Sequence, residues 1–267
     1  MEIKTIVTIL FLSMLGLSLG ANASTISSDE PWVDATEGIT GGSTAITWFP
    51  ANQNSSSSST LDHAQTIIEV YTATWCETCI PAEEALNASI TDHAVKVVKY
   101  HRHLFETEDP FGNNNTEGRW LSRYGPSAVQ ADFNARTPPT VIFGGERMHI
   151  GSHPTAGVSL EEEYSISLNS IMRPPISNSS EFTFTWEDGT FEWSWNWEED
   201  ITACRSNCDT VSTELYMMIV EDTAFFPEGS NGEEYYHRIL RDVIPLGNNS
   251  IEYILPQAWD CLLYTSD

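Results

Sequence analysis

The stretch that decides the fold is Thr66–Cys79, which reads TIIEVYTATWCETC. Its first half, Thr66–Thr72, is rich in β-branched residues and predicts a buried strand. Two cysteines follow, and Glu77–Ile90 then places apolar residues on one helical stripe with acidic residues opposite. A helix start presents free N–H groups and the positive end of its dipole, which would stabilise a thiolate at Cys76. The stretch therefore predicts a strand, a dithiol and a helix in direct succession.

The spacing of the two cysteines allows redox chemistry. Cys79 is expected one helical turn behind Cys76, within disulfide reach, so Cys76 could attack a substrate disulfide and Cys79 could resolve the mixed disulfide. Half of a zinc site has the same spacing, but no second such pair and no suitably spaced histidine pair completes tetrahedral ligation. We therefore expect no metal here, and a metal carrier that adds His101 is the weakest interpretation.

Strands and helices alternate around this motif from residue 61 to residue 173. The further predicted elements are strands at Val95–Tyr100, Thr140–Phe143 and Glu146–Ile150, and helices at Thr116–Phe133 and Ser159–Met172. Gly125-Pro126 is expected to interrupt the first of these two helices. The order β-α-β-α-β-β-α describes one compact α/β domain at 61–173.

A second motif lies about sixty residues beyond the cysteines, where Thr137–Phe143 reads TPPTVIF. A WCxxC sequence after a strand, followed by a proline that opens a later strand, resembles the thioredoxin superfamily. The resemblance implies a thioredoxin-like fold in which Pro139 is preceded by a cis peptide bond and lies against the cysteine pair. It also implies a thiol-disulfide site made of Cys76, Cys79, Pro139 and the flanking Trp75.

Further residues resemble a secreted microbial branch of this superfamily, in which a β-rich domain follows the thioredoxin-like domain. The residues that carry this resemblance are Cys76-x-x-Cys79-x-Pro81, Tyr100-His101 with Asp109-Pro110, Tyr124-Gly125, and Arg241. The resemblance covers about residues 64–172 well and 181–260 loosely.

Three residues depart from the superfamily pattern. Thioredoxins place a buried acid six residues before the first cysteine, but here that position is Val70, and Glu69 should face the other side of the strand. Pro138 has no N–H to offer a substrate backbone. Glu77 opposes a neighbouring thiolate at Cys76 by like charge. A less stabilised thiolate favours the disulfide form, so we expect a weakly oxidising or reducing pair.

The region 174–260 changes character and predicts an antiparallel β-sandwich of immunoglobulin-like type. Apolar and polar residues alternate over Glu181–Trp186, and Asp188-Gly189 is a strong hairpin turn. Further strands are predicted at Glu214–Val220, His237–Pro245 and Ser250–Leu255, and the aromatic residues Phe191, Trp193, Trp195 and Trp197 are expected to point one way. A disulfide between Cys204 and Cys208 is expected to be a structural staple, with a second redox centre as the alternative.

Residues 1–23 are predicted to be a signal peptide, cleaved near Ala23. The apolar run Ile6–Leu19 ends before Ala21-Asn22-Ala23, a pattern that signal peptidase accepts, and is shorter than the ~20 residues of a membrane-spanning helix. Cleavage would place the mature chain in the periplasm, at the cell surface or outside the cell, where disulfides persist.

Two other segments are expected to lie outside the folded domains. Residues 24–60 form an extension that ends in Asn54–Thr60, a Ser-rich run predicted to be a flexible linker. Residues 261–267 resemble translated sequencing-adapter sequence, so this tail and Cys261 are expected to be non-native. Without Cys261, the remaining four cysteines form two close pairs.

The net charge of the chain argues against two classes of binding partner. The chain has 267 residues, with 38 acidic and 12 basic side chains and a net charge of −26. Such a charge repels nucleic acid and anionic lipid, so neither is an expected partner. The thiol-disulfide site that the resemblance implies makes exported protein thiols or disulfides and a redox partner the expected partners. We predict an exported thiol-disulfide oxidoreductase that needs no organic cofactor. The alternative is a secreted or surface binding module with a structural disulfide; the exposed position expected for Cys76 favours the oxidoreductase, and Val70 and Pro138 favour the alternative.

Overall fold

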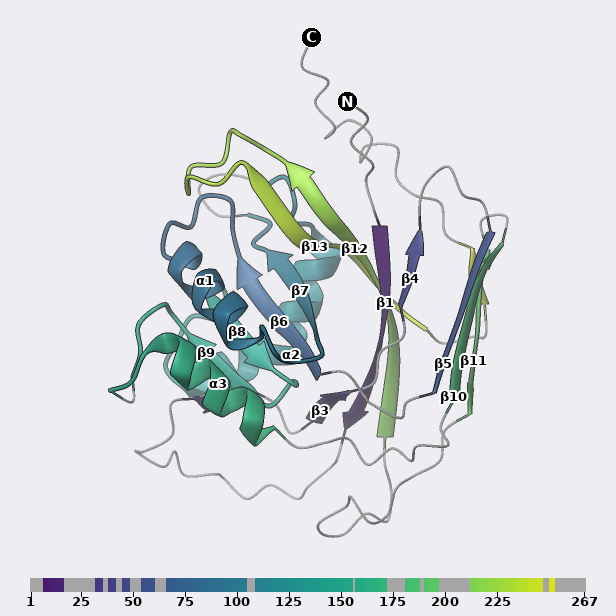
Figure 1. Ribbon diagram of the computed structural model, residues 1–267, viewed down its shortest axis with the longest axis horizontal. Helices are drawn as coiled ribbons and strands as arrows, with labels where there is room; N and C mark the ends of the chain where they lie inside the picture. Colours follow the sequence, from purple (N-terminus) through teal and green to yellow (C-terminus); the bar gives the residue numbers. More distant parts are fainter. Residues whose placement is uncertain are drawn as a thin grey trace.

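The computed structural model contains each predicted strand and helix of the α/β unit. It describes residues 7–16, 32–35, 38–41, 45–48, 54–60, 66–104, 109–155, 157–171, 181–187, 190–196, 212–246 and 250–252. The elements of the α/β unit are β6 (Thr66–Thr72), α1 (Cys79–Ser89), β7 (Val95–His101), α2 (Asn114–Gln130), β8 (Thr140–Phe143), β9 (Arg147–Ile150) and α3 (Leu160–Ser170). The predicted order β-α-β-α-β-β-α is confirmed (Figure 1).

Two helices, α1 and α3, cover one face of the sheet at β6, and one helix, α2, covers the other. Successive residues of a strand point to opposite faces, so Ile68 and Val70 of β6 pack in one cluster with residues of α1 and α3. Ile67 and Tyr71 of the same strand pack in another cluster with Trp120 of α2. The alternation therefore buries both faces of β6, between α1 and α3 on one side and α2 on the other (Figure 1).

The central strands pair in both directions. β6 runs parallel to β7 and antiparallel to β8, and β8 continues through β9 to β2 (Val33–Asp34). Beyond β7 the sheet continues through β13 (Tyr235–Pro245), β12 (Ser212–Phe225) and β1 (Val7–Gly16), which also pairs with β3 (Gly38–Gly41) and β4 (Ala45–Trp48). The result is one ten-stranded mixed sheet.

A second, antiparallel sheet has the order β14-β11-β10-β5. Its strands are β5 (Asn54–Thr60), β10 (Glu181–Glu187), β11 (Thr190–Asn196) and β14 (Ser250–Glu252). The predicted pairing across Asp188-Gly189 is confirmed, because Glu187 lies opposite Thr190. In β11, Trp193 is buried while Glu192 and Ser194 are exposed, as its alternation predicts.

The division of the chain at residue 173 differs from the prediction. The strands expected at Glu214–Val220 and His237–Pro245 exist, but they lie in the sheet of the α/β unit rather than with β10 and β11. Ile239 of β13 lies opposite Lys99 of β7 in a parallel pair. The outer edge of β7 needs a hydrogen-bonding partner, and the alternation of a later strand does not specify which sheet edge it joins.

Two local predictions are also corrected. The Ser-rich run Asn54–Thr60 forms β5 and pairs along its length with β10, because strand pairing uses backbone groups that serine supplies as well as any residue. Helix α2 runs through Gly125-Pro126 without a break. Pro126 removes one backbone donor from the helix, and the turns on either side of it continue the helical course.

Three predictions made outside the α/β unit concern the signal peptide at 1–23, the Cys204–Cys208 disulfide and the tail at 261–267. Val7–Gly16, inside the predicted signal peptide, forms β1 and pairs with β12. The pair Cys204 and Cys208 and the segment 261–267 lie outside the described residues. Across the described part of the chain, no helix combines the length and apolar character needed to span a membrane.

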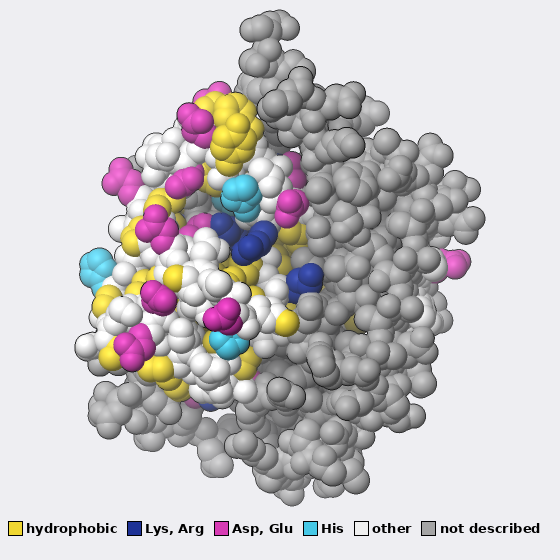
Figure 2. Space-filling view, viewed as in Figure 1, with side chains coloured by type: hydrophobic (Ala, Val, Ile, Leu, Met, Phe, Trp, Pro, Cys, Tyr) yellow, Lys and Arg dark blue, Asp and Glu magenta, His cyan; other side chains and the backbone are white. Residues whose placement is uncertain are grey.

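Acidic side chains are scattered over the described part of the face that Figure 2 shows. Figure 2 shows Asp and Glu spread over one face, while Lys and Arg gather near its middle. A spread of this kind is typical of a solvated surface.

Candidate active site around the Cys76–Cys79 disulfide

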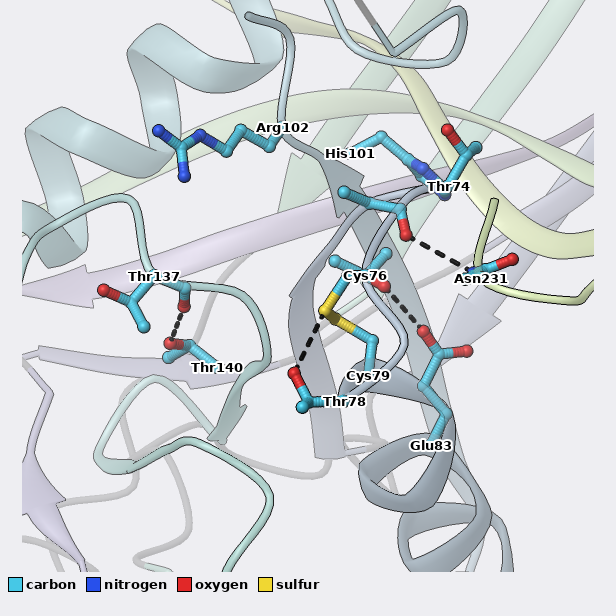
Figure 3. Close-up of a disulfide and its surroundings, with 12 residues drawn as sticks. Thr74, Cys76, Thr78, Cys79, Glu83, His101, Arg102, Thr137, Thr140 and Asn231 are labelled. Atoms are coloured by element: carbon cyan, nitrogen blue, oxygen red, sulfur yellow. Dashed lines mark hydrogen bonds between the residues drawn. A yellow bond between two sulfur atoms is a disulfide. The ribbon is translucent and has the colours of Figure 1, made fainter. Parts of the chain in front are cut away.

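The two cysteines of the WCxxC motif form a disulfide at the carboxyl end of β6. Their sulfur atoms lie 2.09 Å apart and their Cα atoms 5.3 Å apart. Cys79 is completely buried, and Cys76 retains 5 % of its surface. Figure 3 shows the disulfide and the residues around it. Cys76 is thus the less buried residue of the pair, but it is less exposed than the sequence led us to expect.

The helix begins later than predicted, which changes what surrounds Cys76. α1 starts at Cys79, and Cys76 lies in the turn before it, where its N–H donates to the Ala73 carbonyl. The Thr78 hydroxyl lies 3.5 Å from the Cys76 sulfur. A hydroxyl at this place can donate to a thiolate, so Thr78 is a site residue that the sequence reasoning missed.

Trp75 forms one side of the site. It packs in a small cluster with Ala73 and both cysteines. The Arg102 guanidinium lies 5.6 Å from the centre of its ring, within cation–π range, and donates to the Arg136 carbonyl. The predicted role of Trp75 at the rim is consistent with this position.

Pro139 lies at the same end of the sheet as the disulfide. The peptide bond between Pro138 and Pro139 is cis, as the superfamily resemblance implies. The next residue, Thr140, lies opposite Tyr71 in the pairing of β8 with β6. In Figure 3 the loop through Thr137 and Thr140 faces the disulfide from across the site. The fold therefore brings the four predicted site residues to one edge.

The strand position six residues before Cys76 carries no acid, as predicted. Val70 is fully buried in the apolar cluster under α1 and α3. Glu69 faces the opposite side of the sheet, where its carboxylate lies 3.0 Å from Arg119 and accepts a hydrogen bond from Tyr100 at 2.6 Å. Glu69 therefore belongs to the core against α2 and not to the disulfide site.

A different acid lies beneath the disulfide. Glu83 of α1 accepts a hydrogen bond from the Thr72 hydroxyl at 2.7 Å and forms an ion pair with Lys99. Burial alone would raise the pKa of Glu83, but the Lys99 ammonium and these hydrogen bonds hold it below its usual value. The sequence signal was available, because Glu83 follows Cys79 by one helical turn.

His101, the last residue of β7, also lies inside the site. Only 1 % of the residue is exposed, and its Nδ1 lies 3.2 Å from Asp109. The same carboxylate accepts hydrogen bonds from the backbone N–H groups of Thr74 and Phe111. Burial alone would raise the pKa of Asp109, but His101 and these donors lower it. Asp109 thereby ties the loop before Cys76 to the end of β7.

The loop between β12 and β13 supplies a further contact. The Asn231 N–H donates to the Thr74 carbonyl at 3.1 Å, and its side-chain amide donates to the Ala73 carbonyl at 3.4 Å. The Tyr236 hydroxyl donates to the Asn231 side chain at 2.7 Å. These residues are distant in the sequence, so no local pattern could have assigned them to the site.

Arg241 fixes that hairpin to the rest of the unit. Its guanidinium donates to Glu221 of β12 at 2.7 Å and to the Pro110 carbonyl at 3.3 Å. It also lies 4.7 Å from the centre of the Phe111 ring. The Asp109-Pro110 and Arg241 motifs noted in the sequence therefore meet in space.

Within the described part of the chain, no group of three or more His, Cys, Asp or Glu side chains is placed to hold a metal ion. The other residues of the metal-carrier interpretation, Cys76 and Cys79, are joined to each other.

Comparison with known proteins gives little further information. No protein-family model and no curated protein matches the chain. Protein AGR_C_4864 from Agrobacterium tumefaciens, a solved crystal structure, is similar over 68 % of this chain and 94 % of its own, at 14 % identity and a TM-score of 0.32. A likeness this weak carries no argument about fold or function.

Proposed function

We propose that the protein is an exported thiol-disulfide oxidoreductase that acts on extracytoplasmic proteins through Cys76 and Cys79. The observation that carries this proposal is the asymmetry of the pair. Cys76 is the less buried residue, in a turn ahead of α1, and Cys79 is completely buried at the first residue of the helix. Attack on a substrate by one thiol and resolution by a second use this arrangement.

The thioredoxin-like assignment of the α/β unit is part of the same proposal. It is supported by the order of elements from β6 to α3 and by the position of the cysteines between the first strand of that unit and its first helix. The cis bond before Pro139 is a third supporting feature. In this proposal Pro139 shapes the site and prevents metal capture, and Trp75 packs its rim.

The proposed partners follow from the chemistry. Exchange at the pair needs an exported protein thiol or disulfide and a redox partner that resets the cysteines, and no organic cofactor. Export itself is proposed from the signal peptide predicted at residues 1–23. Because Glu77 is exposed next to Cys76 and Pro138 has no N–H, we propose a weakly oxidising or reducing pair rather than a strong oxidant.

The first test is the reduction potential of the pair in a protein that carries Cys204→Ser, Cys208→Ser and Cys261→Ser. Equilibration with glutathione and dithiothreitol buffers should give fast exchange and a potential between about −120 and −270 mV, toward the reducing end of that range. Slow exchange with a potential below about −300 mV would identify a structural disulfide.

A binding module with a structural disulfide is the second candidate, and the 5 % exposure of Cys76 favours it. The Cys79→Ser variant separates the two functions. An oxidoreductase should form mixed disulfides with exported proteins through Cys76, whereas the binding module should form none.

A further inference from the structure

Resolution of a mixed disulfide depends on removal of the proton from the Cys79 thiol. When the pair is reduced, Cys79 must lose its proton before it can attack, because the thiolate is the nucleophile. Cys79 is completely buried, so a base in solution has poor access to it. The strand position that faces α1 offers Val70, which cannot accept a proton.

Glu83 lies where such a base is needed. It follows Cys79 by four residues in α1, and residues at this spacing are neighbours on the helix surface. Figure 3 shows its carboxylate extending from α1 beside the disulfide toward β6, where it accepts the hydrogen bond from Thr72. The ion pair with Lys99 holds the carboxylate in place from the neighbouring strand.

We propose that Glu83 accepts the proton of the Cys79 thiol during resolution of the mixed disulfide, with Lys99 as its positioning residue. This inference rests on the proposed function. In the step, the Cys79 proton passes to the Glu83 carboxylate, and the resulting thiolate attacks the Cys76 sulfur. The Cys76–Cys79 bond forms as the bond between Cys76 and the substrate breaks. The substrate sulfur leaves as a thiolate and takes a proton from water, so the substrate is reduced and the pair is oxidised.

The groups around Glu83 fit an acceptor that is ionised before the step. Lys99 and His101 approach from β7, and both lower the pKa of Glu83. Tyr236 of β13 is a further titratable group near Glu83, whose charge contributes to its raised pKa. Behind His101 lies Asp109, which pairs with that ring. The carboxylate is therefore in its charged form when the step begins.

An aromatic disulfide, 5,5′-dithiobis(2-nitrobenzoate), separates attack from resolution in the triple Cys→Ser background. Attack by Cys76 releases one coloured thiolate, and resolution by Cys79 releases the second. Glu83→Gln should slow the second release by roughly 10- to 100-fold at pH 7, a typical effect of a general base. The first release should stay within about twofold of the wild type, since loss of one general base affects only the step it serves.

The matched control is Glu84→Gln, which removes an exposed carboxylate from the same helix. It should leave both releases unchanged. The effect of Glu83→Gln should shrink toward pH 9, because more of the Cys79 thiol ionises without help; a structural defect would persist at every pH. Equal second releases in wild type and Glu83→Gln would overturn the proposal.

A titration gives a readout that does not need turnover. In a Cys76→Ser background that also lacks Cys204, Cys208 and Cys261, thiolate absorbance reports Cys79 alone. Glu83→Gln should lower the pKa of Cys79, since a neighbouring negative charge is removed. An unchanged titration would show that the two groups do not interact and would overturn the inference.

The outcomes distinguish this inference from the proposed function. A wild-type protein with no first release contradicts the oxidoreductase itself, and the titration then still decides whether Glu83 and Cys79 interact. If Glu83→Gln folds poorly because Lys99 is left unpaired, the double variant Glu83→Gln/Lys99→Gln removes both charges. It should show the same slow second release, and a wild-type rate in that variant would also overturn the proposal.

Discussion

At the residue scale, the Thr78 hydroxyl lies 3.5 Å from the Cys76 sulfur. Thr78→Val removes it with little change of shape. In reduced protein carrying Cys79→Ser, the pKa of Cys76 should rise by about half to one unit, because a hydrogen bond to a charged group contributes about 1 kcal/mol or more. The pH dependence of alkylation measures this pKa. Thr78→Ser keeps the hydroxyl and should behave as wild type; identical titrations for the valine and serine variants would contradict the contact.

A second prediction at the residue scale concerns His149 and the pH dependence of stability. It is buried, its Nε2 lies 2.6 Å from the Ser167 hydroxyl, and burial lowers its pKa to about 4. The unfolded chain, with a pKa near the usual 6.5, binds the proton more readily, so the free energy of unfolding should fall as pH falls through that interval. The free energy of unfolding should fall by up to about 3 kcal/mol in total.

The matched pair for this test is His149→Gln and His153→Gln. Urea denaturation between pH 7 and pH 4 should give a flatter dependence for His149→Gln than for wild type. His153 is exposed, so its variant should follow the wild-type curve. A His149 variant as acid-sensitive as wild type would show that this ring is not the group responsible.

At the element scale, the β12–β13 loop holds the loop before Cys76 in place, and Gly229 is the position that tests this. A Cβ at Gly229 would lie 2.1 Å from the Tyr236 hydroxyl and 3.1 Å from the Thr74 carbonyl. Gly229→Ala should therefore displace the Tyr236 hydroxyl from Asn231 and lower the free energy of unfolding by about 1–3 kcal/mol, as overpacking does. Reduction of the disulfide by dithiothreitol should also become faster.

The control for this loop is Ser230→Ala, an exposed neighbour. It should change neither the urea midpoint nor the rate of disulfide reduction. If Gly229→Ala destabilises the protein but leaves the reduction rate unchanged, the loop stabilises the fold without controlling access to the cysteines.

Individual strands and helices were easier to predict from the sequence than the neighbouring strands with which they pair. The strand at Thr66–Thr72 and the helix after the cysteines were predictable because their periodicity is local. The position of β13 beside β7 was not, because β-branched and aromatic alternation is equally compatible with either sheet. The same limit applies to the site: Cys76 and Pro139 stand in recognisable motifs, whereas Asn231 reaches Thr74 only through the tertiary fold.

At the scale of the whole molecule, the sheet joins the C-terminal strands to the redox unit. β13 and β12 bury Met217, Met218, Ile239 and Leu240 completely, and Met218 and Leu240 lie in the same cluster as Tyr71 and Trp120. Shared burial of this kind makes the strands part of one core. The molecule should consequently unfold as a unit across residue 173 and not as two independent domains.

A chain that ends at Arg173 tests this directly. It would expose the edge of β7 and the apolar face against α2 that Leu240 and Met218 cover, and removing several fully buried side chains costs several kcal/mol. We expect a fragment without a cooperative urea transition, whose disulfide is reduced as fast as in denatured protein. The full-length chain should show one transition in which tryptophan fluorescence and protection of the disulfide change together. A fragment with the midpoint of the full chain would restore an independent domain at 61–173, and it would make the contacts of Asn231 with the cysteine loop dispensable.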